Sequence, residues 1–163
     1  MNRIRCAATS IAVCATIVGI GASAAAAKSV TLHFFSKSVY SRFSDASGKP
    51  LSPSSAFAAG DRFSSASNDY AGNHKHHAKL ATASDHIVCT ITSSSTGICD
   101  GTIAIGGAMI LGDDFVLNFT SNSPTVVKIT GGTGIYRHAH GTVTVKSVGN
   151  NGNTSDVTIK VTY

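Results

Sequence analysis

The chain has 163 residues, with 13 Lys and Arg residues against 8 acidic residues and a formal net charge of +5. All the acidic residues are Asp, and the basic residues are scattered without interleaved aromatic residues, which argues against a nucleic-acid-binding surface. Residues 28–163 alone carry 11 Lys and Arg against 8 Asp, a net charge of +3, and about 136 residues are enough for one domain with a substantial core.

The first 27 residues have the order of a secretory signal peptide. Arg3 and Arg5 precede an apolar run, and the tail Ala22–Ala27 offers several Ala-x-Ala cleavage sites. We therefore expect residues 1–27 to be removed and residues 28–163 to be secreted, without stable membrane insertion. A transmembrane anchor is the alternative, and Gly19 and Gly21 weaken it.

The segments after the leader predict strands of uneven strength. Residues 30–34 alternate apolar and polar side chains, as a half-buried strand does. Residues 36–60 are rich in Ser, Pro and Gly and predict a long irregular segment, either a surface connection or a binding loop. Residues 62–70 and 73–82 predict two weaker strands joined at Ala71-Gly72.

Cys89 and Cys99 are the only cysteines outside the leader. An even pair in an exported protein predicts a disulfide. Cys89 lies in the strand-like run 87–92 and Cys99 opens the run 99–105, so a hairpin folded about Ser94 would place them opposite each other. A metal or redox pair would need a C-x-x-C spacing or further ligands, which are missing.

In the second half of the chain, apolar and polar residues alternate more clearly, with the period of two that is typical of strands. Runs at 115–120, 126–130, 141–148 and 156–163 alternate apolar and polar residues, and Gly- and Asn-rich turns separate them. No segment after the leader shows a helical period. About eight short strands predict an all-β antiparallel sheet, either a sandwich or a barrel, and a barrel of eight can hold one small ligand.

A glycine-dense motif lies between two of these strands, reading Ile-Thr-Gly-Gly-Thr-Gly-Ile-Tyr-Arg-His-Ala-His-Gly over residues 129–141. Three glycines in four positions predict a tight corner, because glycine reaches positive φ without steric cost. A phosphate-binding loop would have to open a helix, whereas β-branched alternation follows here. The motif resembles the G-G-[ST]-G-x-[FY]-x-x-A-x-G signature of the allene oxide cyclase and dirigent barrel superfamily.

Other stretches are similar to this superfamily in the same order: Gly60–Phe63, Tyr70–Lys75, and the cysteine pair followed by Gly106-Gly107. The resemblance implies a single eight-stranded antiparallel β-barrel with a hydrophobic cavity, and assembly into trimers as in plant members. It implies that the protein binds a small hydrophobic molecule, guides its cyclisation or coupling, and needs no cofactor.

The resemblance leaves the activity open. Plant cyclases use a glutamate on the first strand, and this chain has no Glu at all. One alternative is an isomerase or cyclase with a different catalytic set. The other is a structural or interaction protein whose barrel is filled by its own side chains.

The site candidates are aromatic, acidic and histidine residues. The predicted ligand-binding residues are Phe34, Phe63, Tyr70, Phe115, Phe119 and Tyr136. The predicted catalytic candidates are Asp61, Tyr70, Tyr136, His138 and His140. The pairs His74/His76 and His138/His140 would each share one face of a strand and so could meet at a metal, but without a four-ligand spacing the simpler interpretation is solvated histidines.

Overall fold

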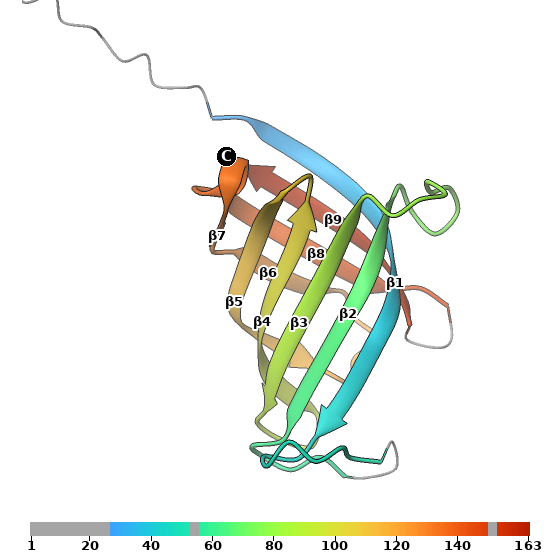
Figure 1. Cartoon of the computed structure of the whole chain (residues 1–163), viewed down its shortest axis with the longest axis vertical. Coiled ribbons are helices and arrows are strands. Elements are labelled where there is room, and N and C mark those ends of the chain that lie inside the picture. The colour runs from blue at the N-terminus through green and yellow to red at the C-terminus, as the bar shows by residue number, and fades with distance from the viewer. Residues whose placement is uncertain (1–26, 53–55, 150–152) are drawn as a thin grey trace, which may run out of the picture.

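The computed structural model describes residues 27–52, 56–149 and 153–163, which form a nearly closed antiparallel β-barrel (Figure 1). Residues 1–26 of the predicted signal peptide lie outside the described residues. The strands in the described part of the chain are β1 (Ser29–Ser44), β2 (Arg62–Ala71), β3 (Ala83–Ile91), β4 (Thr96–Ile105), β5 (Ala108–Asn118), β6 (Thr125–Ile129), β7 (Gly131–Gly132), β8 (His140–Ser147) and β9 (Thr154–Thr162). A single 3-10 turn, η1 (Gly134–Tyr136), lies between β7 and β8.

The sheet closes on itself through one interrupted strand. The strand order is β6-β8-β9-β1-β2-β3-β4-β5-β7, with every pair antiparallel. Only Thr130 separates β6 from β7, so the same stretch of chain pairs with β8 on one side and with β5 on the other. The predicted barrel is confirmed. The count of nine strands over the described residues exceeds the predicted eight because the segment before η1 is split at Thr130.

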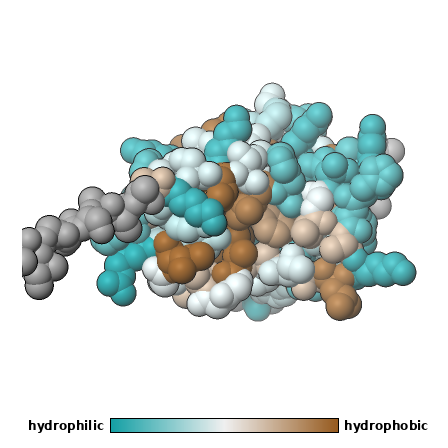
Figure 2. All heavy atoms as spheres, turned by 90° about the horizontal axis from the view of Figure 1, so that it is seen from above, coloured by the Kyte–Doolittle hydropathy of each residue, from teal (hydrophilic) through white to brown (hydrophobic). Residues whose placement is uncertain are grey.

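The apolar core fills one end of the barrel. Its largest members point inward from opposite walls and include Phe34, Ile110, Ile129 and Ile159, and Tyr136 of η1 packs among them. Figure 2 views this end, where the chain terminates, and shows apolar residues in the middle of the face with hydrophilic residues around them. This end of the barrel is therefore packed with side chains.

The β3–β4 hairpin carries the predicted disulfide. Cys89 and Cys99 are directly opposed in the ladder, with Cα atoms 4.0 Å apart, and both residues are 1% exposed. They belong to the inward face of the hairpin, so the bridge is shielded by the barrel. The disulfide prediction is confirmed.

Three local predictions were wrong. The segment from Ser36 is not irregular, because β1 continues to Ser44 with a shift of register between Ser38 and Tyr40. The expected strand over residues 73–82 is a loop, which begins with a turn in which the Asn73 side chain accepts the backbone N–H groups of Lys75 and His76. The Gly-Asp-Asp sequence at residues 112–114 predicts a turn, but these residues form an irregularity within β5, where Asp114 has a φ of 54°.

Within the described residues, no helix has the length and apolar character needed to cross a membrane.

Candidate ligand-binding cavity

The half of the barrel away from the apolar core is hollow. It holds a cavity of about 780 Å³, lined near its mouth by Phe63 at the start of β2 and by Leu117 and Asn118 at the end of β5. This volume lies in the range of small-molecule sites. The cavity exists because many inward positions in this half carry small side chains.

One wall of the cavity is made of serine hydroxyls. Four consecutive strands of the sheet, β8, β9, β1 and β2, place serines on their inward faces. These serines are Ser147, Ser155, Ser36, Ser38, Ser41, Ser65 and Ser67. Ser147 is opposite Ser155 and Ser155 is opposite Ser36 in the ladder, so three hydroxyls form a row across neighbouring strands. Each hydroxyl can both donate and accept a hydrogen bond.

The facing wall is mostly apolar. Ile87 of β3, Ile103 of β4, Phe115 of β5 and Val127 of β6 line it, together with Asp85 of β3 and Thr102 of β4. A serine wall opposite an apolar wall gives the cavity two chemically distinct sides.

A cluster of phenylalanine rings lies at the mouth of the cavity. Phe63 and Phe119 line the cavity, with ring centroids 5.4 Å apart, and Phe43 is 4.7 Å from Phe63. Phe57, from the connection between β1 and β2, stacks on Phe43 at 4.3 Å. Flat aromatic ligands pack well against such rings.

Two aspartates lie where the cavity meets the core. Asp85 of β3 lines the cavity, and its Oδ2 accepts a hydrogen bond from the Ser36 hydroxyl at 3.0 Å. Asp69 of β2 is directly opposite Ser36 in the ladder and is 2% exposed, and its Oδ1 has no hydrogen-bond partner among the described residues. Burial, reinforced by the charge of Asp85, raises the pKa of Asp69 to about 7.

None of the described residues that line the cavity is Lys, Arg or His. The only charged side chain among them is Asp85. An anionic ligand would therefore find no countercharge on the described walls.

The predicted ligand-binding residues divide into two groups. Phe63, Phe115 and Phe119 line the cavity. Phe34 and Tyr136 lie instead in the packed core at the opposite end.

Tyr70 was expected to face the cavity, and the structure corrects this. The inward positions of β2 are those of Ser65, Ser67 and Asp69, so Tyr70 points outward. On the outer surface its ring centroid lies 5.5 Å from that of His77 and 5.1 Å from Lys37 Nζ.

The predicted catalytic candidates do not come together either. Asp61 is buried, but its carboxylate accepts the backbone N–H of Ala58 at 2.8 Å in the loop before β2 and does not line the cavity. Burial and the neighbouring Tyr163 raise the pKa of Tyr136, which is enclosed in the core. His138 and His140 are exposed, and His138 lies in the turn after η1, so they do not share a strand face.

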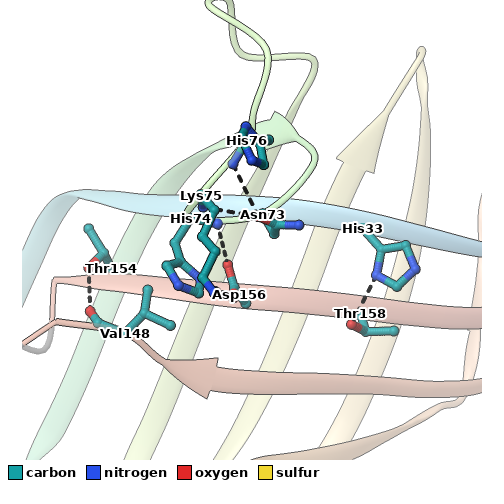
Figure 3. Close-up of polar contacts among 9 residues, drawn as sticks. All are labelled: His33, Asn73, His74, Lys75, His76, Val148, Thr154, Asp156 and Thr158. Atoms are coloured by element: carbon teal, nitrogen blue, oxygen red, sulfur yellow. Dashed lines mark hydrogen bonds and ion pairs between the residues drawn. The ribbon is translucent and has the colours of Figure 1, made fainter.

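Two histidines of the 72–82 loop, His74 and His77, contact the outer wall of the barrel, and Figure 3 shows His74 beside Asp156. His74 binds Asp156 of β9 through both its backbone N–H and its imidazole, and the ring of His77 packs 4.7 Å from that of Phe35. His74 and His76 lie in a turn and not in a strand. Among the described residues, no three His, Cys or acidic side chains gather in a group that could hold a metal ion.

Sequence reasoning missed the serine wall and the aspartate pair. The available signal was a period of two in polar residues, with Ser36 and Ser38 in β1, and Ser65, Ser67 and Asp69 in β2. Because serine-rich runs are typical of loops, the alternation of these serines was not interpreted as one polar face of a strand.

No family model and no curated protein matches the sequence. Solved structures do match the barrel. A protein named pyocyanin demethylase is 22% identical, with a TM-score of 0.58 over 81% of this chain and 99% of its own. The pterocarpan synthase dirigent protein PsPTS1 is 17% identical, with a TM-score of 0.57 over 83% of this chain and 92% of its own. A second pterocarpan synthase dirigent protein, GePTS1, is 16% identical, with a TM-score of 0.56 over 83% of this chain and 84% of its own.

The chain has the dirigent-type barrel fold. This confirms the fold that the glycine motif implied. The names of the matching structures include both a demethylase and dirigent proteins, so the dirigent-type fold does not choose an activity for this chain.

Proposed function

We propose that this dirigent-type barrel binds one small molecule inside its cavity and guides the cyclisation or coupling of that molecule. The single observation that carries the proposal is the cavity of about 780 Å³ with a serine wall facing an apolar wall. The ligand would have a hydrophobic, preferably flat body and oxygen or nitrogen atoms along one edge.

The apolar wall and the serine wall would make different contributions to ligand binding. Burial of an apolar ligand surface against Ile103, Phe115 and Phe119 supplies most of the affinity, at about 25 cal/mol per Å². The serine hydroxyls fix the orientation, because a polar ligand edge turned toward the apolar wall would lose its hydrogen bonds. A ligand held in one conformation cyclises or couples along fewer paths than it does in water.

The cavity bears differently on the two alternative functions, a structural barrel and an isomerase or cyclase. A structural barrel filled by its own side chains has less support, since so large a cavity would be left empty. An isomerase or cyclase requires an acid or base in the cavity, and Asp85 is the residue placed to serve as one.

We also infer that the barrel works outside the cytoplasm. The leader pattern of residues 1–27 supports export, and the buried Cys89–Cys99 disulfide is consistent with an oxidising compartment.

The first experiment is native mass spectrometry of the exported protein purified from its own source, followed by extraction of any bound molecule. A copurifying small molecule would identify the substrate class directly, and incubation of its precursor with the protein would show whether the product distribution changes. In parallel, binding of the uncharged probe 1-naphthylmethanol can be followed by its intrinsic fluorescence.

Two matched variants test whether the cavity is the site. Ser65 points into the cavity, whereas its neighbour Ser64 is not among the cavity-lining residues. We expect Ser65→Phe to weaken probe binding by at least about tenfold, because its ring occupies the cavity, and Ser64→Phe to leave binding unchanged. Equal binding by both variants would refute the proposed function.

A further inference from the structure

Asp69 and Asp85 form a carboxyl pair with no positive partner in the part of the chain that the structure describes. The two residues are diagonal neighbours on the inward faces of β2 and β3, since Ser67 is opposite Asp85 and Asp69 is opposite Ala83. One neutral hydroxyl, that of Ser36, donates to Asp85, and Oδ1 of the 2% exposed Asp69 is left unsatisfied. Buried polar atoms are rarely left without a partner, so this one needs an explanation.

The charged side chains on the surrounding strands do not compensate the pair. Lys37 of β1 lies over the rings of Phe35 and Tyr70, and His33 contacts Thr158. Arg62 of β2 and His86 of β3 are exposed, and Asp156 of β9 binds His74 on the outer wall. The inward residues of β4 and β9 near the pair, Ile103, Ser155 and Val157, do not titrate.

We propose that Asp69 and Asp85 form an organic-cation subsite at the inner end of the cavity, so that the ligand carries a protonated amine or a comparable cation on its apolar body. This rests on the proposed function, because it concerns the ligand of the same cavity. Asp85 contacts the cation, Ser36 and Ser67 accept hydrogen bonds from it, and Asp69 contributes the second carboxylate behind Asp85.

Without a ligand the pair keeps one proton below about pH 7. Asp69 holds it because burial and the charge of Asp85 both disfavour a second carboxylate. A bound cation reverses this balance, because it stabilises two carboxylates in place of one, and the proton is released. Cation binding therefore strengthens as the pH rises through about 7, the pKa of Asp69.

Three isosteric probes separate this inference from the proposed function: 1-naphthylmethylamine (cationic), 1-naphthylmethanol (neutral) and 1-naphthoate (anionic). At pH 8 we expect the amine to bind at least about tenfold more tightly than the alcohol, and the carboxylate to bind most weakly. Between pH 5.5 and pH 8 the affinity for the amine should rise about tenfold while the affinity for the alcohol stays level. Calorimetry in two buffers of different ionisation enthalpy should record proton release with the amine alone.

The variants Asp85→Asn and Asp69→Asn should abolish the preference for the amine while binding of the alcohol persists. Asp100→Asn is the matched control, because Asp100 lies on β4 outside the cavity lining, and this variant should keep the preference. If the alcohol binds as tightly as the amine in the parent protein, the cation subsite is refuted and the proposed function stands. If none of the three probes binds, both fail. The pH dependence in the parent protein decides the question even if an Asp variant does not fold.

Discussion

At the scale of single residues, the late glycine motif contains positions with different physical requirements. Gly141 has a φ of +137°, and a Cβ atom there would collide with the carbonyl oxygen of Lys160 on β9. Gly131 has no positive φ, and the nearest atom to a Cβ at that position would be 4.0 Å away. Gly141 thus allows β8 to approach β9 closely, whereas a methyl group at residue 131 has room.

We expect Gly141→Ala to lower the free energy of unfolding by on the order of 2–4 kcal/mol, because the added methyl group forces β8 and β9 apart and strains the backbone. Gly131→Ala should change it by less than about 1 kcal/mol. Chemical denaturation of the two variants measures both values. Similar losses in both would show that the motif acts as a general flexible corner.

The buried carboxyl of Asp69 makes stability depend on pH. Its pKa is raised from 3.8 to about 7, so the folded protein binds this proton more tightly than the unfolded chain does. The free energy of unfolding therefore falls as the pH rises between these two values. Asparagine has the same shape and no titrating proton.

We expect Asp69→Asn to stabilise the protein relative to the parent, with a gain about 2–3 kcal/mol larger at pH 8 than at pH 5. Denaturation curves at the two pH values measure this difference. Asp100→Asn serves as the control and should show no such increase. A gain that is constant with pH would mean that the pKa of Asp69 is not raised in the folded protein, so that its carboxyl is already ionised there at pH 5.

At the scale of elements, the β3–β4 hairpin is held by both its ladder and its disulfide. Cys89 and Cys99 are 10 residues apart in sequence, so the bridge closes a short loop in the unfolded chain. Both residues are 1% exposed, which keeps reducing agents away from the sulfur atoms while the barrel is folded.

Replacing both cysteines by alanine should lower the free energy of unfolding by about 3 kcal/mol, the loop-closure entropy expected for this separation. Denaturation with and without a reducing agent provides the check. The reductant should destabilise the parent protein during unfolding and have no effect on the double variant. An unchanged double variant would show that the hairpin is specified by its ladder alone.

At the scale of the whole molecule, the barrel is closed by a short seam between β5 and β7. The ladder joins Ile110 to Gly132 and Leu111 to Gly131, and the backbone N–H of Thr130 donates to the Leu111 carbonyl oxygen. At Gly112 a Cβ atom would clash with Val127, so β5 and β6 still touch there. Among the described residues no ladder joins β5 to β6, and residues of both strands, Leu117 and Thr125 among them, line the cavity.

Hydrogen exchange should reveal this seam. We expect amides in residues 113–118 to exchange faster than those in residues 108–112, because only the first half of β5, residues 108–112, lies between two strand partners, β4 and β7. Mass spectrometry of peptides from these two segments measures the difference. Binding of a cavity ligand should slow exchange in residues 113–118, and uniform protection along β5 in the free protein would contradict the open seam.

The sequence by itself determined the local features of this barrel. The period of two over residues 126–130, 141–148 and 156–163, the turn residues between these runs and the spacing of Cys89 from Cys99 specify strands and a bridged hairpin through contacts between near neighbours. They predicted an antiparallel β-sheet and the disulfide, and the resemblance of the glycine motif to the dirigent barrels selected a barrel over a sandwich. Phe63, Phe115 and Phe119 were also expected in the cavity, because the resemblance to the dirigent barrels implied an aromatic ligand site, and they line it.

Only the tertiary structure determined which side chains line the cavity. Tyr70 and the inward-facing Asp69 are adjacent in β2, and only the closure of the sheet settles which of the two faces the interior. The serine wall joins Ser147, Ser155 and Ser36, which are far apart in sequence and meet only because β8, β9 and β1 are neighbours. A cavity forms only where many small inward-facing residues from different strands come together, so no local sequence pattern can predict it.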